Sequence, residues 1–397
     1  MICEVCGNPS ISLALTLGDQ PLPDDLKEIG DKTPCERFPI EVYFCDHCKT
    51  AQQGCRVPPE KLFHPDYHYR AAQTKDVLDG MRQFTDAVVA RYGSMQGKKV
   101  LDIGCNDGSL LDFFWERGAI TTGIEPTDAA REAAAKGHGI DQAFFNPRMA
   151  GYYLRTYGEP DIITFTNVFA HIEDLPRLIG CLEQIKKPDT KIIIENHYLG
   201  SVLATHQFDT FYLEHPRTYS YTSFRFIAKQ LGMHVGHVEF PQRYGGNIRV
   251  YLEPGIKDDV LYTNDLDETD FGPRLKKLGE QVGTWRVNKR KELIDTYMGW
   301  GPFPAAAFPA RASILLNLLD ADLIIEAVYE KEGSKKIGHL VPGTAIPIKS
   351  ERDFPRSLLG WPMLNLAWHI PNEIKQRWNE NGYFGVMFPA VSEGDFQ

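Results

Sequence analysis

The sequence predicts an α/β protein built around a mostly parallel, doubly wound sheet. Three observations support this prediction. Short apolar runs alternate with helix-like segments between residues 100 and 251, six of the eight cysteines lie in the first sixty residues, and apolar segments separated by turn residues continue beyond residue 300. We therefore expect a cysteine-rich module at 1–62, the doubly wound domain at 63–254 and a smaller α/β domain at 255–397, with a boundary at Pro254-Gly255.

Composition narrows the class of protein. The chain has 397 residues, of which 43% are hydrophobic and 24% charged, values that are typical of a globular protein with a sizeable core. The formal net charge of -10 argues against a nucleic-acid partner, because such proteins usually present a basic face. The sequence has no apolar run of about 18–20 residues and no signal-like start at Met1, so we expect a soluble, cytoplasmic protein without a membrane partner.

The cysteines form two closely spaced pairs. Cys3 and Cys6 are separated by two residues, as are Cys45 and Cys48, which is the spacing that presents four thiolates to a tetrahedral Zn²⁺. Disulfides are the weaker interpretation in a cytoplasmic chain. Four thiolates leave no open position for a substrate, so the expected zinc is structural. Three nearby residues remain alternative ligands: Cys35, His47 and Cys55.

Further elements follow from the spacing of apolar residues. Uninterrupted apolar runs indicate buried strands, and apolar residues at intervals of three or four indicate helices. The expected strands are 38–44, 100–103, 141–145, 161–166, 191–195, 235–240 and a last one ending at 251; the expected helices are 74–92, 110–117, 128–136, 148–157, 219–230 and 273–298.

The stretch 100–109 predicts a cofactor site. It is an apolar strand that breaks at Gly104 and Gly108 and then resumes as a helix, the arrangement of the first strand-to-helix turn in a Rossmann-like domain. A dinucleotide requires Gly-x-Gly-x-x-Gly, whereas these glycines are four apart and follow Asp102. About twenty residues later, Glu125 ends the next strand, where an acid can bind a ribose diol. This pattern favours S-adenosylmethionine and hence a methyltransferase; a purely structural turn is the alternative.

Histidines stand where a catalytic site is expected. His171 follows the strand at 161–166, and the carboxyl ends of such strands hold active sites. His215 lies beside Glu214 in a run at 208–216 that has neither helical nor strand periodicity, which is typical of an active-site loop. A single histidine would normally be an ordinary core residue, but two at expected site positions favour a function. Tyr67 and Tyr69 share one face of the preceding segment, either as a packed linker or as a substrate-facing lip.

With these pieces placed, the chain resembles the sugar C-methyltransferases, which act on nucleotide-linked 4-keto-6-deoxy sugars. The likeness extends over nearly the whole chain and rests on the order of its motifs. These are the four paired cysteines, Asn106-Asp107-Gly108, 167–171, 212–215, 245–249, Val341-Pro342-Gly343-Thr344 and Leu366-Ala367-Trp368-His369. The resemblance implies a zinc module, a domain for S-adenosylmethionine and a C-terminal domain that helps bind the nucleotide sugar.

The resemblance also implies roles for individual residues. His215 would remove the C3 proton of the 4-keto sugar, oriented by Glu214, while His171, Tyr212 and Tyr69 would surround the keto oxygen. Asn106, Asp107 and Asn167 would join Asp102, Gly104, Gly108 and Glu125 at the cofactor. One departure stands out, because Ala307-Phe308-Pro309-Ala310-Arg311-Ala312 replaces the expected Gly-Ala-x-x-Lys-Gly, which leaves the nucleotide and sugar preference open.

Three other functions are alternatives to C3 methylation by S-adenosylmethionine. An O- or N-methyltransferase acting on a sugar or another small molecule needs a base but no ketone. A zinc-dependent methyltransferase of nucleic acids would explain the cysteines but conflicts with the acidic charge balance. A binding module without catalysis is the third. The sequence makes no prediction of the oligomeric state.

Overall fold

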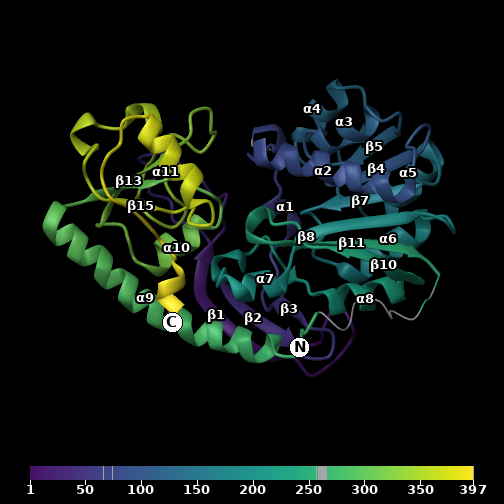
Figure 1. The fold of residues 1–397 in the computed structure, drawn as a ribbon, viewed down its shortest axis with the longest axis horizontal. Helices are drawn as coiled ribbons and strands as arrows, with labels where there is room; N and C mark the ends of the chain where they lie inside the picture. Colours follow the sequence, from purple (N-terminus) through teal and green to yellow (C-terminus); the bar gives the residue numbers. More distant parts are fainter. Residues whose placement is uncertain (66, 74, 256, 258–265, 397) are drawn as a thin grey trace.

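Three β-sheets organise the part of the chain that the computed structural model describes, which comprises residues 1–65, 67–73, 75–255, 257 and 266–396. The central domain and the C-terminal domain form two lobes, and the N-terminal sheet lies against both of them (Figure 1). Apolar side chains of all three parts belong to one contiguous core, which includes Leu15, Phe211 and Ile314. The three parts are therefore packed on one another.

The central sheet has seven strands in the order β10-β11-β8-β7-β4-β5-β6. Only β11 runs against the others, so the sheet is mostly parallel and the Rossmann-like fold class is confirmed. The strands are β4 Lys99–Ile103, β5 Ile120–Ile124, β6 Gly139–Asp141, β7 Ile162–Thr166, β8 Lys191–His197, β10 Met233–Glu239 and β11 Asn247–Pro254. Ile192, Ile193 and Ile194 are completely buried because helices cover both faces of the sheet.

Helices on the two faces belong to different apolar clusters. Residues of α2 (Lys75–Tyr92) and α3 (Ser109–Trp115) pack with Val100 and Ile162. The neighbouring residues Leu101 and Ile163 point the other way, toward the cluster that contains the remaining large helices. These are α5 Pro147–Tyr157, α6 Leu175–Ile185 and α8 Tyr221–Gln230, while the shorter α4 spans Ala129–Ala135. The expected helices agree with these bounds within a few residues, and Thr74, the expected start of the first, lies outside the described residues.

One expected strand is misplaced. The prediction for 141–145 corresponds to β6 at Gly139–Asp141, which pairs with β5. The residues after Asp141 leave the sheet because Asn146 already caps the next helix, its side chain accepting a hydrogen bond from the Met149 amide at 3.0 Å.

The N-terminal sheet receives a strand from the central domain. Its order is β1 (Ser12–Pro21), β2 (Arg37–Cys45), β3 (Thr50–Gln53) and β9 (Arg217–Thr218), all antiparallel. β9 follows the loop that contains His215. The cysteine-rich module therefore holds one end of that loop through backbone pairing.

The C-terminal sheet has five parallel strands in the order β14-β13-β12-β15-β16. They are β12 Phe303–Ala306, β13 Ile325–Glu330, β14 Ile348–Ser350, β15 Met363–Asn365 and β16 Met387–Pro389, with the helices α10 Ala312–Leu318 and α11 Pro371–Glu380. The unusual segment at 307–312 links the central strand β12 to α10. Its position at the carboxyl end of a parallel strand is where such sheets bind ligands.

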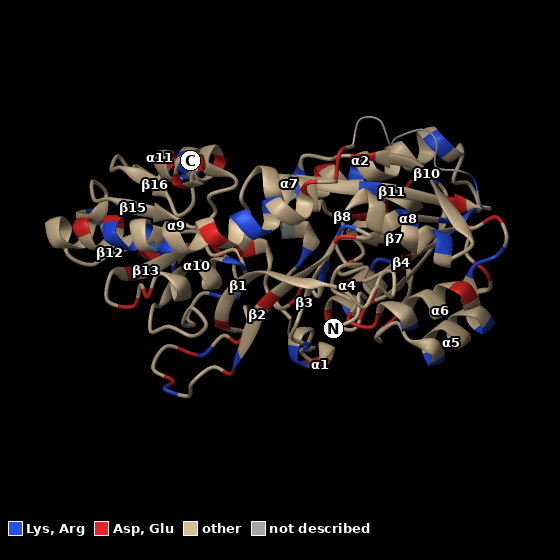
Figure 2. Ribbon diagram, turned by 90° about the horizontal axis from the view of Figure 1, so that it is seen from below, with Lys and Arg blue, Asp and Glu red and all other residues tan. Residues whose placement is uncertain are grey.

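Helix α9 (Phe271–Trp300) joins the lobes and runs along the lower edge of the molecule toward β1 (Figure 1). Acidic and basic residues are interspersed along it (Figure 2). Arg286 and Arg290 both pair with Asp320, and the buried Lys289 pairs with Glu292. These pairs give several basic side chains of α9 a structural role.

No helix among the residues with described positions has the length and apolar character needed to cross a membrane.

Candidate functional site

The four paired cysteines converge on one point. Their Sγ atoms lie within 4.8 Å of one another, with 3.4 Å between Cys3 and Cys48 and 3.6 Å between Cys6 and Cys45. Tetrahedral thiolates at about 2.3 Å from a Zn²⁺ stand about 3.8 Å apart, so this arrangement fits zinc. Among the described residues the cluster contains neither Cys35, whose Sγ accepts from the Gly343 amide, nor His47, whose ring packs on Phe226.

Glu4 connects the cysteine cluster to the loops of the central domain. It lies between Cys3 and Cys6 in the sequence. Its carboxylate pairs with Arg56 and with the buried Arg217 of β9. Arg217 also donates to the carbonyls of Ile172 and Glu173, directly after His171. Folding of the zinc module therefore fixes the segments that follow His171 and His215.

The glycines of the cofactor turn are required by both conformation and space. Gly104 has a φ of +74°, and a Cβ there would lie 2.5 Å from Val168 Cγ1. Gly108 has a φ of +77°, and its Cβ would lie 2.9 Å from that of Ala133. Positive φ favours glycine, and the close neighbours exclude any side chain. The turn thus brings the backbone against the loop that begins at Asn167.

Exchanging Gly104 for alanine, beside a matched control, separates the cost of the positive φ from the cost of the contact with Val168. Gly97 has a similar φ of +71° but open space around it, so Gly97→Ala is a matched control. We expect Gly97→Ala to lower the free energy of unfolding by about 1–2 kcal/mol and Gly104→Ala to lower it by about a further 1–3 kcal/mol. Urea unfolding measures both values. Equal losses would show that Val168 does not constrain the turn.

Two residues that are expected to bind the cofactor hold the neighbouring segment of the chain. Asn106 Oδ1 accepts from the Ala71 amide at 3.0 Å, and Asp107 Oδ2 accepts from the Ala72 amide at 2.8 Å. Asn106 Nδ2 donates to the Tyr69 carbonyl at 3.1 Å. Their side chains therefore hold the segment before α2 over the cofactor turn, and their role at the cofactor stays a prediction.

The remaining cofactor candidates lie at adjacent strand ends. Glu125 Oε2 accepts from the Asn106 amide at 3.0 Å, and Oε1 accepts from the amide and hydroxyl of Thr127. A carboxylate has about four acceptor positions, so one remains for a ribose hydroxyl. Asp102 accepts from Thr164 Oγ1 at 2.7 Å, and burial raises the pKa of its carboxyl to about 7. Asn167, with φ +54°, accepts from Asn247 Nδ2 at 3.2 Å.

Three imidazoles form the centre of the candidate active site. The rings of His171 and His215 have centroids 4.7 Å apart, and those of His197 and His215 are 5.3 Å apart. We call these three residues the histidine cluster. The ring of Tyr212 lies 4.2 Å from that of His215. The structure thus brings together His171, Tyr212 and His215, and it adds His197 from the end of β8.

Hydrogen bonds determine which nitrogen of His215 carries the proton. Its Nδ1 is 3.0 Å from the Thr210 carbonyl oxygen, which can only accept, so Nδ1 is the donor. The Nε2 of the neutral ring then has a lone pair, as a general base requires. His171 Nδ1 likewise donates to the Glu214 carbonyl at 2.7 Å, and His197 Nδ1 contacts Thr210 Oγ1 at 2.9 Å.

Burial keeps the histidine cluster uncharged. It lowers the pKa of His171 to about 4 and that of His197 to about 3. The pKa of His215 is also held well below its usual value, by burial and then by the neighbouring imidazoles and Arg311. All three rings are therefore neutral near pH 7.

Glu214 points away from His215, although it is adjacent in sequence. Its Oε2 accepts from the Tyr67 hydroxyl at 3.1 Å, while Thr210 orients the imidazole. Burial and the nearby Asp24 carboxylate raise the pKa of Glu214 to about 8. Glu214 is therefore protonated near neutral pH. The expectation that it orients His215 does not match this geometry, because consecutive loop side chains diverge.

Tyr67 reaches the candidate site through a side-chain contact with Glu214. Its ring also packs on Phe63, which contacts His171. Tyr69 is 44% exposed, and its carbonyl accepts hydrogen bonds from Asn106 and Arg70. The catalytic role expected for Tyr69 stays a prediction.

Sequence reasoning missed two contributions to the site. His197 ends the strand β8, and position at a strand end was the signal that could have identified it, as it did for His171. Arg311 and Trp368 reach the 207–210 turn from the C-terminal domain, with Arg311 Nη1 donating to Gln207 Oε1 at 3.0 Å. Nothing local in the sequence indicates such a contact between distant segments.

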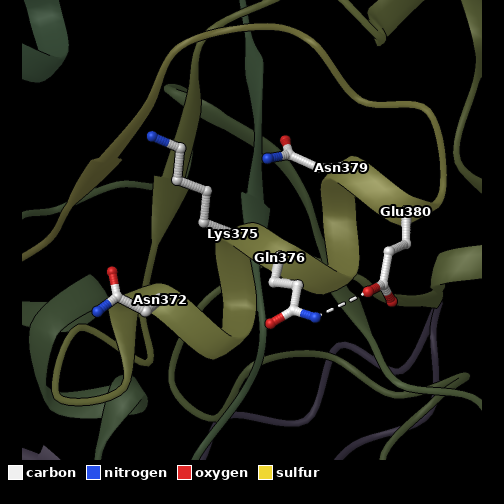
Figure 3. Close-up of a pocket in the computed structure, with 5 residues that line it drawn as sticks. All are labelled: Asn372, Lys375, Gln376, Asn379 and Glu380. Atoms are coloured by element: carbon white, nitrogen blue, oxygen red, sulfur yellow. Dashed lines mark hydrogen bonds between the residues drawn. The ribbon is translucent and has the colours of Figure 1, made fainter.

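A surface hollow elsewhere is not part of this site. Figure 3 shows polar side chains of α11 around it, among them Gln376, whose Nε2 donates to Glu380 Oε1 at 2.9 Å. All its lining residues are exposed and belong to one helix. This is the solvated face of α11, opposite the buried Ile374 and Trp378.

Two family models match separate parts of the chain. Residues 77–238 match a family model described as a methyltransferase domain, and residues 3–63 match a putative zinc binding domain. The C-methyltransferase NovU of Streptomyces niveus is 25% identical over 98% of this chain and 95% of its own length. The ubiquinone biosynthesis O-methyltransferase of Pasteurella multocida is 32% identical over 26% of this chain and 47% of its length.

Among solved structures, magnesium protoporphyrin IX methyltransferase from Synechocystis with bound SAM aligns with 46% of this chain and 83% of its own, at 18% identity and a TM-score of 0.35.

The match to the zinc binding domain contains the four clustered cysteines, so the structural zinc site is confirmed. The chain is therefore a methyltransferase that joins an N-terminal zinc-binding domain to a methyltransferase domain and is homologous to the C-methyltransferase NovU over nearly its whole length.

Proposed function

We propose that the protein transfers a methyl group from S-adenosylmethionine to C3 of a nucleotide-linked 4-keto-6-deoxy sugar. The homology to a C-methyltransferase supports methylation of carbon. Carbon is a poor nucleophile unless a neighbouring group acidifies its C–H bond, and a 4-keto group does this for C3. The reaction then needs a neutral base, a donor for the enolate oxygen and a pocket without competing charge.

His215 is the base in this proposal, and its hydrogen bond is the observation that carries the proposal. The Thr210 carbonyl holds the proton on Nδ1, so Nε2 takes the C3 proton and the ring becomes an imidazolium. The C–H electron pair moves into the C3–C4 bond, and the carbonyl π electrons move to the oxygen. The Thr210 carbonyl then also stabilises the positive ring.

The enolate oxygen needs a hydrogen-bond donor, and Tyr212 supplies it in this proposal. Its ring is 4.2 Å from that of His215, which places a phenol beside the base. The proton of His171 is engaged by the Glu214 carbonyl. His171 therefore positions the loop in this proposal and does not donate to the oxyanion.

The cofactor lies at the ends of β4 and β5 in this proposal, with Glu125 on its ribose. When bound, S-adenosylmethionine would supply an electrophilic methyl group on a sulfonium, which C3 would take while the electron pair of the broken C–S bond returned to sulfur. The chain's own residues make the carbanion and exclude water from it.

The pH dependence follows from Glu214 and His215. We expect kcat/KM to hold as the pH falls through 6.5, because His215 stays neutral, and to decline as the pH rises through about 8, where ionised Glu214 opposes the developing enolate. Glu214→Gln should remove the alkaline decline. An acidic decline centred near 6.5, or an unchanged alkaline decline in Glu214→Gln, would contradict these assignments.

The same ionisation affects stability. Because the pKa of Glu214 is raised from 4.5 to about 8 in the folded protein, its contribution to stability is present below about pH 4.5 and is lost as the pH rises through about 8. The free energies of unfolding of the wild type and of Glu214→Gln, measured in urea, should diverge between about pH 4.5 and about pH 8.

Turnover with paired substrates tests the proposed function. The protein is incubated with S-adenosylmethionine and dTDP-, GDP- or CDP-linked 4-keto-6-deoxy sugars, each beside its 4-hydroxy counterpart. We expect S-adenosylhomocysteine with one keto sugar and not with its counterpart, because only the ketone acidifies C3. Equal turnover of the 4-hydroxy sugar would indicate O-methylation instead.

A further inference from the structure

A short turn connects the histidine cluster to the C-terminal domain. It comprises Gln207 and the 3₁₀ helix Phe208–Thr210. On one side, Thr210 contacts His215 through its carbonyl and His197 through its hydroxyl. On the other side, Asp209 and Gln207 contact Arg311 and Trp368. Asp209 is therefore adjacent in sequence to the residue whose backbone oxygen orients the base.

Asp209 is buried with an unmet hydrogen-bonding capacity. The residue is 0% exposed, and its Oδ2 accepts from Trp368 Nε1 at 2.9 Å. Its Oδ1 accepts no hydrogen bond from any described residue, and Arg311 Nη1 stays 3.6 Å away. A second buried atom in this region, His369 Nδ1, also lacks a hydrogen-bond partner among the described residues. Buried polar atoms are rarely left unpaired in a protein, and a bound group that donates a hydrogen bond to Oδ1 would pair this one.

The partners of Arg311 hold its guanidinium in place. Nη1 donates to Gln207 Oε1 at 3.0 Å, and the guanidinium carbon lies 5.7 Å from the centre of the Trp368 indole ring. Arg311 is also largely buried. Stacking and the hydrogen bond fix the plane of the guanidinium, so it cannot move freely to close the gap to Asp209.

A hydroxyl group has both the donor and the acceptor that these two side chains can pair with. It can accept a hydrogen bond from Arg311 and at the same time donate one to Asp209 Oδ1. An ammonium group has no acceptor for Arg311, and it would place two cations against each other in a buried site. The pair therefore discriminates between the two substituents that a sugar commonly carries next to a ketone.

We propose that Asp209 and Arg311 form a subsite for the C3 hydroxyl of the substrate and select a 3-hydroxy sugar over a 3-amino sugar. The assignment to C3 rests on the proposed function, because His215 removes the proton from that carbon. The segment 307–312 gives a reason for the choice, since it places an arginine, which keeps its charge and its planar geometry, opposite the buried carboxylate.

Calorimetry tests the subsite without requiring turnover. Matched 3-hydroxy and 3-amino 4-keto-6-deoxy sugars, each linked to dTDP, GDP or CDP, are titrated into the full chain in the presence of S-adenosylhomocysteine. We expect the 3-hydroxy sugar to bind about 10- to 100-fold more tightly than its 3-amino partner. Equal affinity, preference for the amine or binding of neither sugar would overturn the subsite. Selective binding without methyl transfer would retain the subsite and overturn the proposed function.

Variants separate binding from folding. Asp209→Asn keeps the shape of the side chain and an acceptor for Trp368, and Arg311→Lys keeps the charge but loses the planar donor. Both should shrink the preference for the 3-hydroxy sugar at least about tenfold, mainly through KM wherever turnover is measurable. Asp320→Asn, which removes an acid paired with α9, is the control and should retain the preference. If the variants weaken the binding of both sugars equally, Asp209 and Arg311 only support the fold and do not select the substituent.

Discussion

Replacing His215 by alanine is expected to abolish exchange of the C3 hydrogen with solvent and to lower methyl transfer by about 10²–10⁴-fold. The neutral Nε2 of His215 is the base of the proposed mechanism, and its tautomer is fixed by the Thr210 carbonyl at 3.0 Å. Incubation with a 4-keto sugar nucleotide in D₂O, followed by NMR, measures the exchange directly. Exchange at the wild-type rate in His215→Ala would remove His215 as the base.

Two further variants keep this experiment specific. His215→Asn retains a donor for the Thr210 carbonyl but has no basic nitrogen, so it should fold and still fail to exchange. His234 is the matched histidine, because it is 8% exposed like His215 and its Nδ1 also contacts a backbone carbonyl, that of Gly255 at 2.9 Å. His234→Ala should cost stability and leave exchange by the folded protein intact.

Removing the zinc is expected to have the second largest effect, because the metal supports the catalytic loops from a distance. Structural zinc contributes about 10–16 kcal/mol of binding free energy in small domains, and without it the first cysteine pair would separate from the second. Glu4 would then lose its position against Arg217, and the segments after His171 and His215 would lose their anchor. We expect Cys6→Ser, or treatment with a strong chelator, to lower both the melting temperature and methyl transfer.

Zinc content, melting temperature and turnover are measured together for this prediction. Cys55→Ser is the control, since Cys55 lies outside the cluster and should retain the metal and the activity. Glu4→Gln tests the connection itself, because it should keep the zinc while lowering turnover. A zinc-free protein with unchanged melting temperature and activity would contradict this account.

The central fold could be predicted because its strands are buried on both faces. Continuous apolar runs such as 161–166 and 191–195 have few other interpretations in a chain of this composition. β1 was missed because its alternation is interrupted by register shifts between Leu13 and Leu15 and between Thr16 and Gly18. The pairing of β9 with β3 was also beyond prediction, since two residues leave no periodic pattern.

The candidate site was predictable only where the sequence departs from regular periodicity. His215 could be identified because its loop fits neither a helix nor a strand, and His171 because it follows a buried strand. Their contact at 4.7 Å is a tertiary property, as is the approach of Arg311 from a domain about a hundred residues away. The sequence does not distinguish Tyr67 from Tyr69, because the anchoring of the 69–72 backbone by Asn106 and Asp107 is a tertiary contact.

The position of the transferred methyl group tests the central claim most directly. The protein is supplied with S-adenosylmethionine carrying a ¹³C-labelled methyl group and with the 4-keto sugar nucleotide that supports turnover, and the product is analysed by NMR. This account predicts that the labelled methyl carbon is bonded to C3 of the sugar and that C3 has lost its hydrogen. A labelled methyl group on oxygen or nitrogen would contradict it.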